Sequence, residues 1–127
     1  MSKKPLIIST DPGIDDIAAM TISLFADELD VKMIVPTWGN VSLAHTLQNT
    51  LDLENFLHTK VPVVKGANQP LVRPAISAAS VHGETGIAGF EFEKANDELL
   101  EPGLAATKMY EAIKNSPEKV TLLGVGP

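Results

Sequence analysis

The stretch LIISTDPGIDD, residues 6–16, decides the fold of this chain. Residues 6–9 form a short, mostly apolar run, which is typical of a buried parallel strand. A Pro-Gly pair breaks the run, and Asp15 and Asp16 follow where a helix begins, because the first turn of a helix favours negative charge. We therefore expect Asp11 at the carboxyl end of a strand, which is the edge where open α/β sheets bind ligands.

Three carboxylates, those of Asp11, Asp15 and Asp16, gather at this strand end. Carboxylates so close together repel one another unless a positive charge lies among them, and no Lys or Arg stands between Lys4 and Lys32. A bound cation could supply that charge, and oxygen ligands suit a hard ion such as Ca²⁺ or Mg²⁺. Two solvated aspartates at a helix start, next to an aspartate in a turn, would explain the same residues without an ion.

The rest of the chain alternates between strand-like and helix-like segments. The expected strands are 31–37, 61–65 and 120–125, the expected helices are 15–26, 43–58 (after an N-cap at Ser42) and 104–115, and residues 66–101 show no periodicity. This alternation predicts an α/β fold with a doubly wound, mostly parallel sheet. Because parallel strands end at the same edge of such a sheet, we expect Asp11, Asn40 and Val125 to lie together there.

Three of these elements carry expectations about packing. The helix at 15–26 is apolar nearly all round, so it is expected to be covered on both sides. In the following helix, Leu43, Leu47 and Leu51 form a stripe at i, i+4 and i+8 that is expected to face the core. The last segment, 120–125, is a continuous apolar run and is expected to be a buried strand.

Composition argues against several kinds of partner and location. The 127 residues suffice for one domain, and 44 % of them are hydrophobic, which indicates a globular protein. With a net charge of −6 and no basic patch, the chain is poorly suited to bind nucleic acid or an anionic membrane. The sequence has no cysteine, no signal-peptide pattern and no stretch of membrane-spanning length, so a cytoplasmic location is expected.

Five motifs together resemble the inosine-uridine type of the nucleoside hydrolase family. Their order matches the family across the whole chain, although the family usually begins the first motif with a further Asp where this chain has Ser9. In the family, the Gly-Pro of the last motif continues into the second half of the catalytic domain. The resemblance therefore implies that residues 1–127 are the N-terminal part of one larger nucleoside hydrolase domain. The motifs are DPGIDD at 11–16, WGNV at 38–41, VVKGA at 63–67, HGETG at 82–86 and LLGVGP at 122–127.

The resemblance also implies a Ca²⁺ site and an activity. Asp11 and Asp16 would bind the ion through their side chains and Val125 through its backbone carbonyl, while a further Asp ligand would lie outside this chain. The ion would hold two ribose hydroxyls and a water molecule, whose proton Asp11 would accept, and Asp15 and Asn40 would hydrogen-bond the ribose. The implied reaction hydrolyses ribonucleosides to ribose and free base for salvage, in dimers or tetramers. The 127 residues alone are expected to be inactive, because part of the site is missing.

Histidine supplies a second candidate catalytic residue. In the family, the His of the HG motif lies near the base and the ribose, so the resemblance implies that His82 helps to protonate the leaving base. An alternative is a loop histidine paired with a neighbour such as Glu84. The glycine-rich stretch 83–89 is compatible with a hinged lid and also with an ordinary surface loop. His45 and His58 fall on the second helix and are expected at the surface.

Two other classes of function stay open. One is a Mg²⁺-dependent phosphatase with Asp11 as nucleophile, although such enzymes usually carry a DxDx(T/V) signature that the residues after Asp11 do not follow. The other is a non-catalytic binding or assembly module built on a truncated fold. Assays of phosphate monoesters against nucleosides would separate the two enzyme classes.

Overall fold

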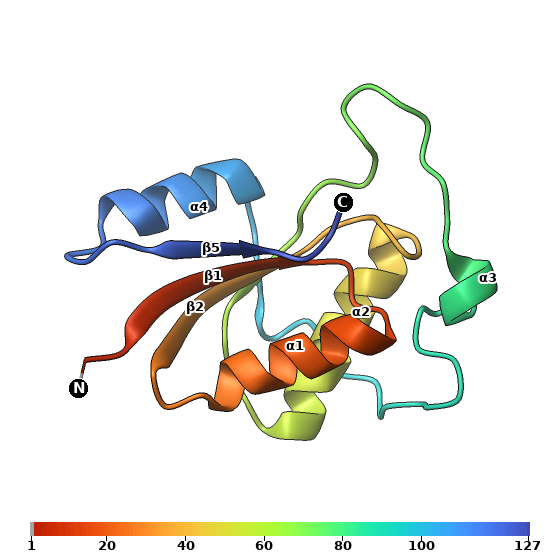
Figure 1. Ribbon diagram of the computed structural model, residues 1–127, viewed down its shortest axis with the longest axis horizontal. Helices are drawn as coiled ribbons and strands as arrows, with labels where there is room; N and C mark the ends of the chain where they lie inside the picture. The colour runs from red at the N-terminus through yellow and green to blue at the C-terminus, as the bar shows by residue number, and fades with distance from the viewer. Residues whose placement is uncertain (1) are drawn as a thin grey trace.

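A computed structural model describes residues 2–127 and contains one five-stranded sheet (Figure 1). The strands lie in the order β4-β3-β2-β1-β5, and every neighbouring pair is parallel. The α/β fold with a parallel sheet is therefore confirmed. In chain order the elements are β1 (Lys4–Thr10), α1 (Ile14–Phe25), β2 (Leu29–Pro36), α2 (Leu43–Leu57), β3 (Val63–Val64), α3 (Ala79–His82), β4 (Leu100–Glu101), α4 (Ala105–Lys114) and β5 (Thr121–Gly124).

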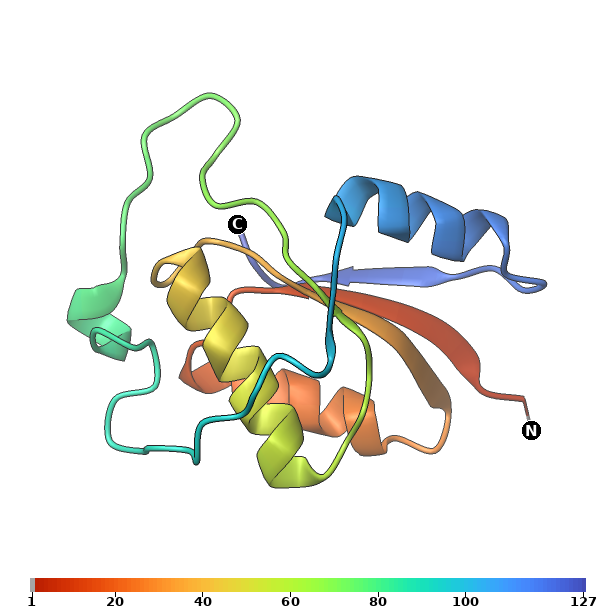
Figure 2. The same cartoon turned by 180° about the vertical axis from the view of Figure 1, so that it is seen from behind.

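Helices cover both faces of the sheet (Figures 1 and 2). On one face, Met109 of α4 packs against a buried cluster that includes Ile7 of β1. On the other face, Met20 of α1 and Leu53 of α2 form a second cluster with Ile34 of β2. Two cores on opposite sides of one parallel sheet make the arrangement doubly wound, as the alternation of segments predicts.

Strand β1 holds the position that the apolar run predicts for it. It pairs with β2 on one side and with β5 on the other. Leu6, Ile7 and Ile8 are all buried, because helices cover both faces of the strand. The carboxyl end of β1 therefore opens between the ends of two neighbouring strands.

Two expectations of burial were wrong. On α1, Ile22 and Phe25 are 69 % and 59 % exposed, because within residues 2–127 this helix packs against the sheet and α2 on one side only. Strand β5 lies at the edge of the sheet, and its Leu122 is 53 % exposed.

Neither helix α1 nor any other described helix is both long and apolar enough to cross a lipid bilayer.

The long segment between β3 and α4 is mostly irregular, as expected. It contains the four-residue helix α3 and the two-residue strand β4, which pairs with β3 at the edge of the sheet. No strand was expected at residues 100–101, because two residues carry no periodic pattern. The part of the segment before α3 extends away from the body of the molecule (Figures 1 and 2). Leu71 within it is fully exposed.

The buried face of α2 differs from the predicted leucine stripe. Ser42 caps the helix as expected, since its side chain accepts a hydrogen bond from the His45 N–H at 3.5 Å. The helix then turns polar residues inward, and the Thr46 hydroxyl, for example, donates to the Thr37 carbonyl at 2.8 Å. These side chains are buried because α2 faces strand-end loops whose backbone groups need hydrogen-bond partners. The buried residues of α2 are Thr46, Asn49, Thr50, Leu51, Asp52, Leu53 and Glu54.

A buried carboxyl fastens the turn from α2 to β3. Glu54 Oε1 accepts hydrogen bonds from the Val61 N–H at 2.8 Å and from the Thr59 hydroxyl at 3.2 Å. Its Oε2 is buried and has no partner within residues 2–127. Burial raises the pKa of Glu54 from 4.5 to about 7, although the bonds from Val61 and Thr59 act in the opposite direction.

This carboxyl predicts a pH-dependent stability. The folded state keeps the Glu54 proton between about pH 4.5 and 7 while the unfolded state releases it, so the free energy of unfolding falls as pH rises through that window. The loss reaches up to about 3 kcal/mol above pH 7. We expect Glu54→Gln to flatten this part of the profile in urea unfolding at pH 5 and pH 8. The exposed Glu91→Gln is the control, and an unchanged slope in Glu54→Gln would contradict the assignment.

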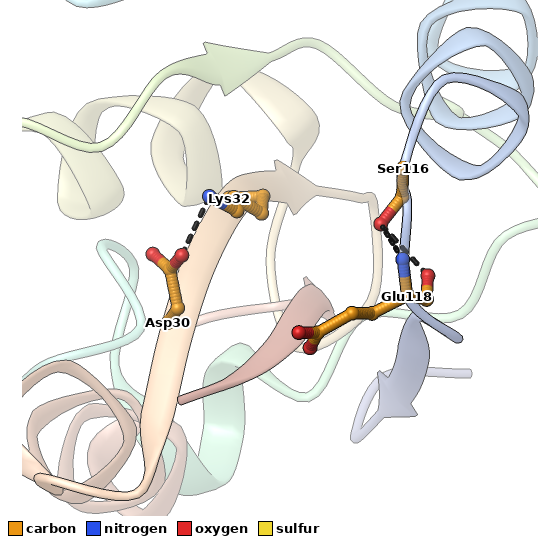
Figure 3. A network of polar contacts seen from close by, with 4 residues as sticks. All are labelled: Asp30, Lys32, Ser116 and Glu118. Carbon is orange, nitrogen blue, oxygen red and sulfur yellow. Dashed lines mark hydrogen bonds and ion pairs between the residues drawn. The ribbon is translucent and has the colours of Figure 1, made fainter. Parts of the chain in front are cut away.

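Two groups of exposed polar contacts lie near the amino ends of β2 and β5 (Figure 3). Lys32 and Asp30 form an ion pair on β2. In the turn from α4 to β5, the Ser116 hydroxyl donates to the Glu118 carbonyl at 2.7 Å, and the Glu118 N–H donates back to Ser116 Oγ at 3.3 Å. Exposed pairs of this kind contribute little to stability.

Candidate functional site

A cavity of about 300 Å³ lies at the carboxyl ends of β1, β2 and β5. It brings together Asp11, Asn40 and Val125, so the predicted convergence of the three strand ends is confirmed. All six candidate site residues of the sequence line this cavity. The full lining is Asp11, Asp15, Asp16, Trp38, Gly39, Asn40, Ile76, His82, Val125, Gly126 and Pro127.

The loop after β2 holds the Asp11 carboxylate in place. The Asn40 N–H donates to Asp11 Oδ2 at 2.8 Å, and the Asn40 side-chain amide donates to the Asp11 carbonyl at 2.9 Å. Gly39 lies so close that a Cβ on it would overlap the Asp11 carboxylate, which explains a glycine at this position. The WGN motif therefore orients Asp11 through the backbone as well as through the Asn40 side chain.

Asp16 is held by hydrogen-bond donors at the carboxyl end of β1. Its Oδ2 accepts hydrogen bonds from the Thr10 hydroxyl at 2.7 Å and from the Asp11 N–H at 3.1 Å. The pKa of Asp16 is raised to about 6, mainly by burial and also by the neighbouring Asp11 carboxyl, although the bonds from the Thr10 hydroxyl and the Asp11 N–H act in the opposite direction. No Lys or Arg of the described chain lines the cavity, so two buried acids lie close together without a cationic side chain.

The donor set suits part of the coordination shell of a hard cation. Asp11 and Asp16 each use Oδ2 for hydrogen bonds, and their Oδ1 atoms accept none within residues 2–127. Val125, held by a 3.0 Å bond from its N–H to the Ser9 carbonyl, lines the same cavity. Over this described range, however, no three His, Cys, Asp or Glu side chains are grouped to hold a metal ion. Ca²⁺ takes six to eight oxygen ligands, so these residues could supply only some of them.

Asp15 and Trp38 lie at the rim of the cavity. Asp15 is exposed at the start of α1 and makes no hydrogen bond through its side chain to the described residues. An exposed carboxylate beside a cavity is free to accept hydrogen bonds from a ligand's hydroxyl groups. Trp38 is half-buried and also lines the cavity.

His82 ends α3 and reaches the same cavity. Its Nδ1 is buried and has no hydrogen-bond partner in residues 2–127. A Cβ on Gly13 would lie 2.9 Å from this Nδ1, so the imidazole packs directly against the Pro-Gly turn after β1. Glu84 is exposed, and within residues 2–127 it forms no ion pair with His82. The alternative of a His82–Glu84 pair is therefore wrong. His45 on α2 and His58, which caps the carboxyl end of that helix, are exposed, as expected.

Two polar residues near the cavity were missed by reasoning from the sequence. Thr10 could have been found, because it directly precedes Asp11 at the strand end and its hydroxyl can donate to a carboxylate. Asn49 carried no signal, since a polar residue within a helix usually faces solvent. In the structure the Asn49 side chain is 5 % exposed and donates to the carbonyls of Pro12 and Thr85 at 3.2 and 2.6 Å.

Comparisons with known proteins agree on one family. Residues 6–127 match the model of a family described as inosine-uridine preferring nucleoside hydrolase. The chain is 44 % identical over 124 residues to the non-specific ribonucleoside hydrolase RihC of Klebsiella pneumoniae subsp. pneumoniae and to that of Escherichia fergusonii. In both cases the match covers 97 % of this chain and 40 % of the relative. The chain thus spans about two fifths of the length of these curated relatives.

Solved structures give the same result for the fold. A structure described as the plant nucleoside hydrolase PpNRh1 matches with a TM-score of 0.89 and 29 % identity, over 99 % of this chain and 40 % of that one. A structure described as an inosine-guanosine nucleoside hydrolase matches with a TM-score of 0.87 and 25 % identity, over 98 % and 40 %. Both matches include the strand ends that form the cavity, because they extend over nearly the whole chain.

Proposed function

Because the chain belongs to the inosine-uridine preferring nucleoside hydrolase family, we propose that it forms the N-terminal part of an enzyme that hydrolyses ribonucleosides with Ca²⁺ as cofactor. The observation that carries this proposal is the placing of Asp11. Asn40 holds one carboxylate oxygen, the other accepts no hydrogen bond from residues 2–127, and His82 lines the same cavity. A fixed carboxylate and a histidine beside one small cavity suit acid–base cleavage of a glycosidic bond.

Three residues would hold part of the Ca²⁺ shell in this proposal. These are the side chains of Asp11 and Asp16 and the carbonyl of Val125. Ca²⁺ bound here would supply positive charge that orients oxygen groups and makes water more acidic. It would also compensate the two buried carboxyls, which have no cationic side chain beside them in residues 2–127.

The chain's own residues would carry the proton transfers. Asp11 accepts a proton from water as the water oxygen bonds to C1′ of the ribose. The bond from C1′ to the base nitrogen breaks, its electron pair leaves with the base, and His82 donates a proton to that base. Asp15 and Asn40 hydrogen-bond the ribose hydroxyls and orient the ring. The nearby carboxylates stabilise the positive charge that develops on the ribose.

The wider setting follows from the proposed reaction. The products, ribose and a free base, suit salvage of purines and pyrimidines in the cytoplasm, by a homodimer or homotetramer. The relatives from Klebsiella and Escherichia are described as non-specific ribonucleoside hydrolases. Both a purine and a pyrimidine nucleoside are therefore appropriate test substrates.

The test uses a full-length form, meaning this chain extended to the length of its relatives. We expect it to hydrolyse inosine and uridine, and we expect removal of Ca²⁺ with a chelator to lower turnover at least tenfold, because the carboxylates then lack their counter-charge. Adding Ca²⁺ back should restore turnover, and calorimetry should show that the ion binds.

The controls separate this proposal from its competitors. The 127-residue chain alone should be inactive and should bind Ca²⁺ weakly, since part of the shell is absent. A phosphate monoester tests the phosphatase alternative and should not be hydrolysed. Full turnover after complete removal of Ca²⁺ would contradict the cofactor assignment, and no turnover with either nucleoside would contradict the reaction.

A further inference from the structure

We propose that Asn49 is a positioning residue that sets the distance between the Asp11 loop and His82. This inference rests on the proposed function, because it assigns Asn49 a part in the same site. Asn49 lies in the middle of α2 and does not line the cavity. It therefore acts on the chemistry through other residues.

Both hydrogens of the Asn49 amide are engaged. Nδ2 lies 3.2 Å from the Pro12 carbonyl and 2.6 Å from the Thr85 carbonyl. Both partners are acceptors, so the NH₂ group must face them and the orientation of the amide is fixed by the contacts. Asn49 is also 5 % exposed, so water does not replace these bonds in the folded protein.

The two carbonyls belong to the two loops that carry the catalytic candidates. Pro12 directly follows Asp11, and Thr85 lies three residues after His82 in the HGETG motif. One loop follows β1 and the other follows α3, so they are far apart in the sequence. The Asn49 amide connects them by bonding one carbonyl in each. A change at Asn49 would therefore change the spacing of the two loops before it changed anything else in the cavity.

Close packing around the bridge leaves little freedom. Gly86, with φ of +88°, is so near that a Cβ on it would lie 3.1 Å from the Pro12 carbonyl oxygen and 3.4 Å from Asn49 Nδ2. On the cavity side, Gly13 packs against the His82 ring, where a Cβ would lie 2.9 Å from Nδ1. The bridge, the Pro-Gly turn and the imidazole thus form one packed unit, and a displaced bridge displaces the ring.

The effect falls on His82 more than on Asp11. Asp11 has independent support, because the Asn40 N–H and side-chain amide hold it at 2.8 and 2.9 Å. The backbone of His82 is bonded to Ala78 and Ala88, but its ring has no such support, since Nδ1 is without a partner in the described chain. The ring is held by packing against Gly13 and by the course of residues 82–86, which Asn49 fastens at Thr85.

The test compares Asn49→Leu with Asp52→Ala in the full-length enzyme. Leucine has a similar size but no donor, so both carbonyls lose their partner. We expect kcat for inosine to fall about tenfold to a hundredfold with little change in KM, because small displacements of catalytic groups reduce rates by this order. Asp52 is the matched control, because it is buried on the same helix and fastens the same irregular segment through the Ala95 N–H at 2.8 Å, away from the cavity. Asp52→Ala should leave kcat within threefold.

A double-mutant cycle shows whether Asn49 acts through His82. In a His82→Gln background, Asn49→Leu should lower kcat by less than threefold, because the group it positions is already absent. Additive losses, or equal losses in Asn49→Leu and Asp52→Ala, would overturn the proposal. If Asn49→Leu does not fold, Asn49→Ser replaces it, since serine keeps one donor and should give an intermediate kcat.

A readout without substrate separates this proposal from the proposed function. The ¹H–¹³C NMR signals of the His82 ring should shift in Asn49→Leu and stay in place in Asp52→Ala. If the unaltered enzyme does not hydrolyse nucleosides, the proposed function fails, while the NMR comparison still decides whether Asn49 positions His82. Unmoved His82 signals in Asn49→Leu would overturn the positioning role whatever the activity.

Discussion

Replacement of Asp11 by Asn in the full-length form is expected to lower kcat for inosine and uridine by about 10²–10⁴, the usual loss when a positioned base is removed. The fold should survive, because the amide oxygen of the new side chain can still accept the hydrogen bond from the Asn40 N–H. The free Oδ1 position would then carry an NH₂ group, which cannot accept a proton from water. Less repulsion beside Asp16 should leave the apo protein at least as stable as before.

Two further measurements on Asp11→Asn, of Ca²⁺ affinity and of thermal unfolding, accompany the measurement of kcat. The affinity for Ca²⁺ in calorimetry should fall, because an uncharged amide replaces a carboxylate ligand. Thermal unfolding of the apo protein should change little. Asp27→Asn is the control, since Asp27 is exposed and follows the carboxyl end of α1, whereas Asp11 precedes the amino end of that helix. Near-normal turnover by Asp11→Asn would contradict the assignment of Asp11 as the base.

The parts of the fold that carry long or strongly patterned segments were predictable from the sequence. The run at β1 could be recognised because a strand covered on both faces is continuously apolar. The convergence of Asp11, Asn40 and Val125 followed from topology alone, since the ends of parallel strands share an edge. A two-residue strand such as β4 has no pattern to read, and its place depends on pairing with β3.

Burial and the supporting contacts of the site were less predictable. The sequence of α2 contains a leucine stripe, yet the helix buries Thr46, Asn49 and Glu54, because neighbouring loops present backbone groups that need partners. Such demands come from tertiary contacts and leave no trace in local periodicity. The exposed side of α1 has a similar origin, since an apolar surface in the sequence does not say which element covers it.

The second large effect is expected at His82. His82→Gln should lower kcat for inosine by about 10²–10⁴, because glutamine cannot donate a proton to the leaving base and histidine is the side chain best suited to do so near neutral pH. The position of the ring in the cavity supports this role. Glutamine is of similar length, so packing against Gly13 should be largely kept and thermal unfolding should change little.

The choice of substrate isolates the chemical role of His82. A 4-nitrophenyl riboside has a leaving group that departs as a stable anion, so its cleavage needs no proton from the enzyme. We expect His82→Gln to hydrolyse this riboside within about tenfold of the unaltered enzyme, whereas Asp11→Asn should remain impaired with both substrates because the water still needs its base. His45→Gln, which changes an exposed histidine on α2, should affect neither substrate. Equal losses with inosine and with the riboside would show that His82 holds the substrate or the cavity in shape and does not act as the acid.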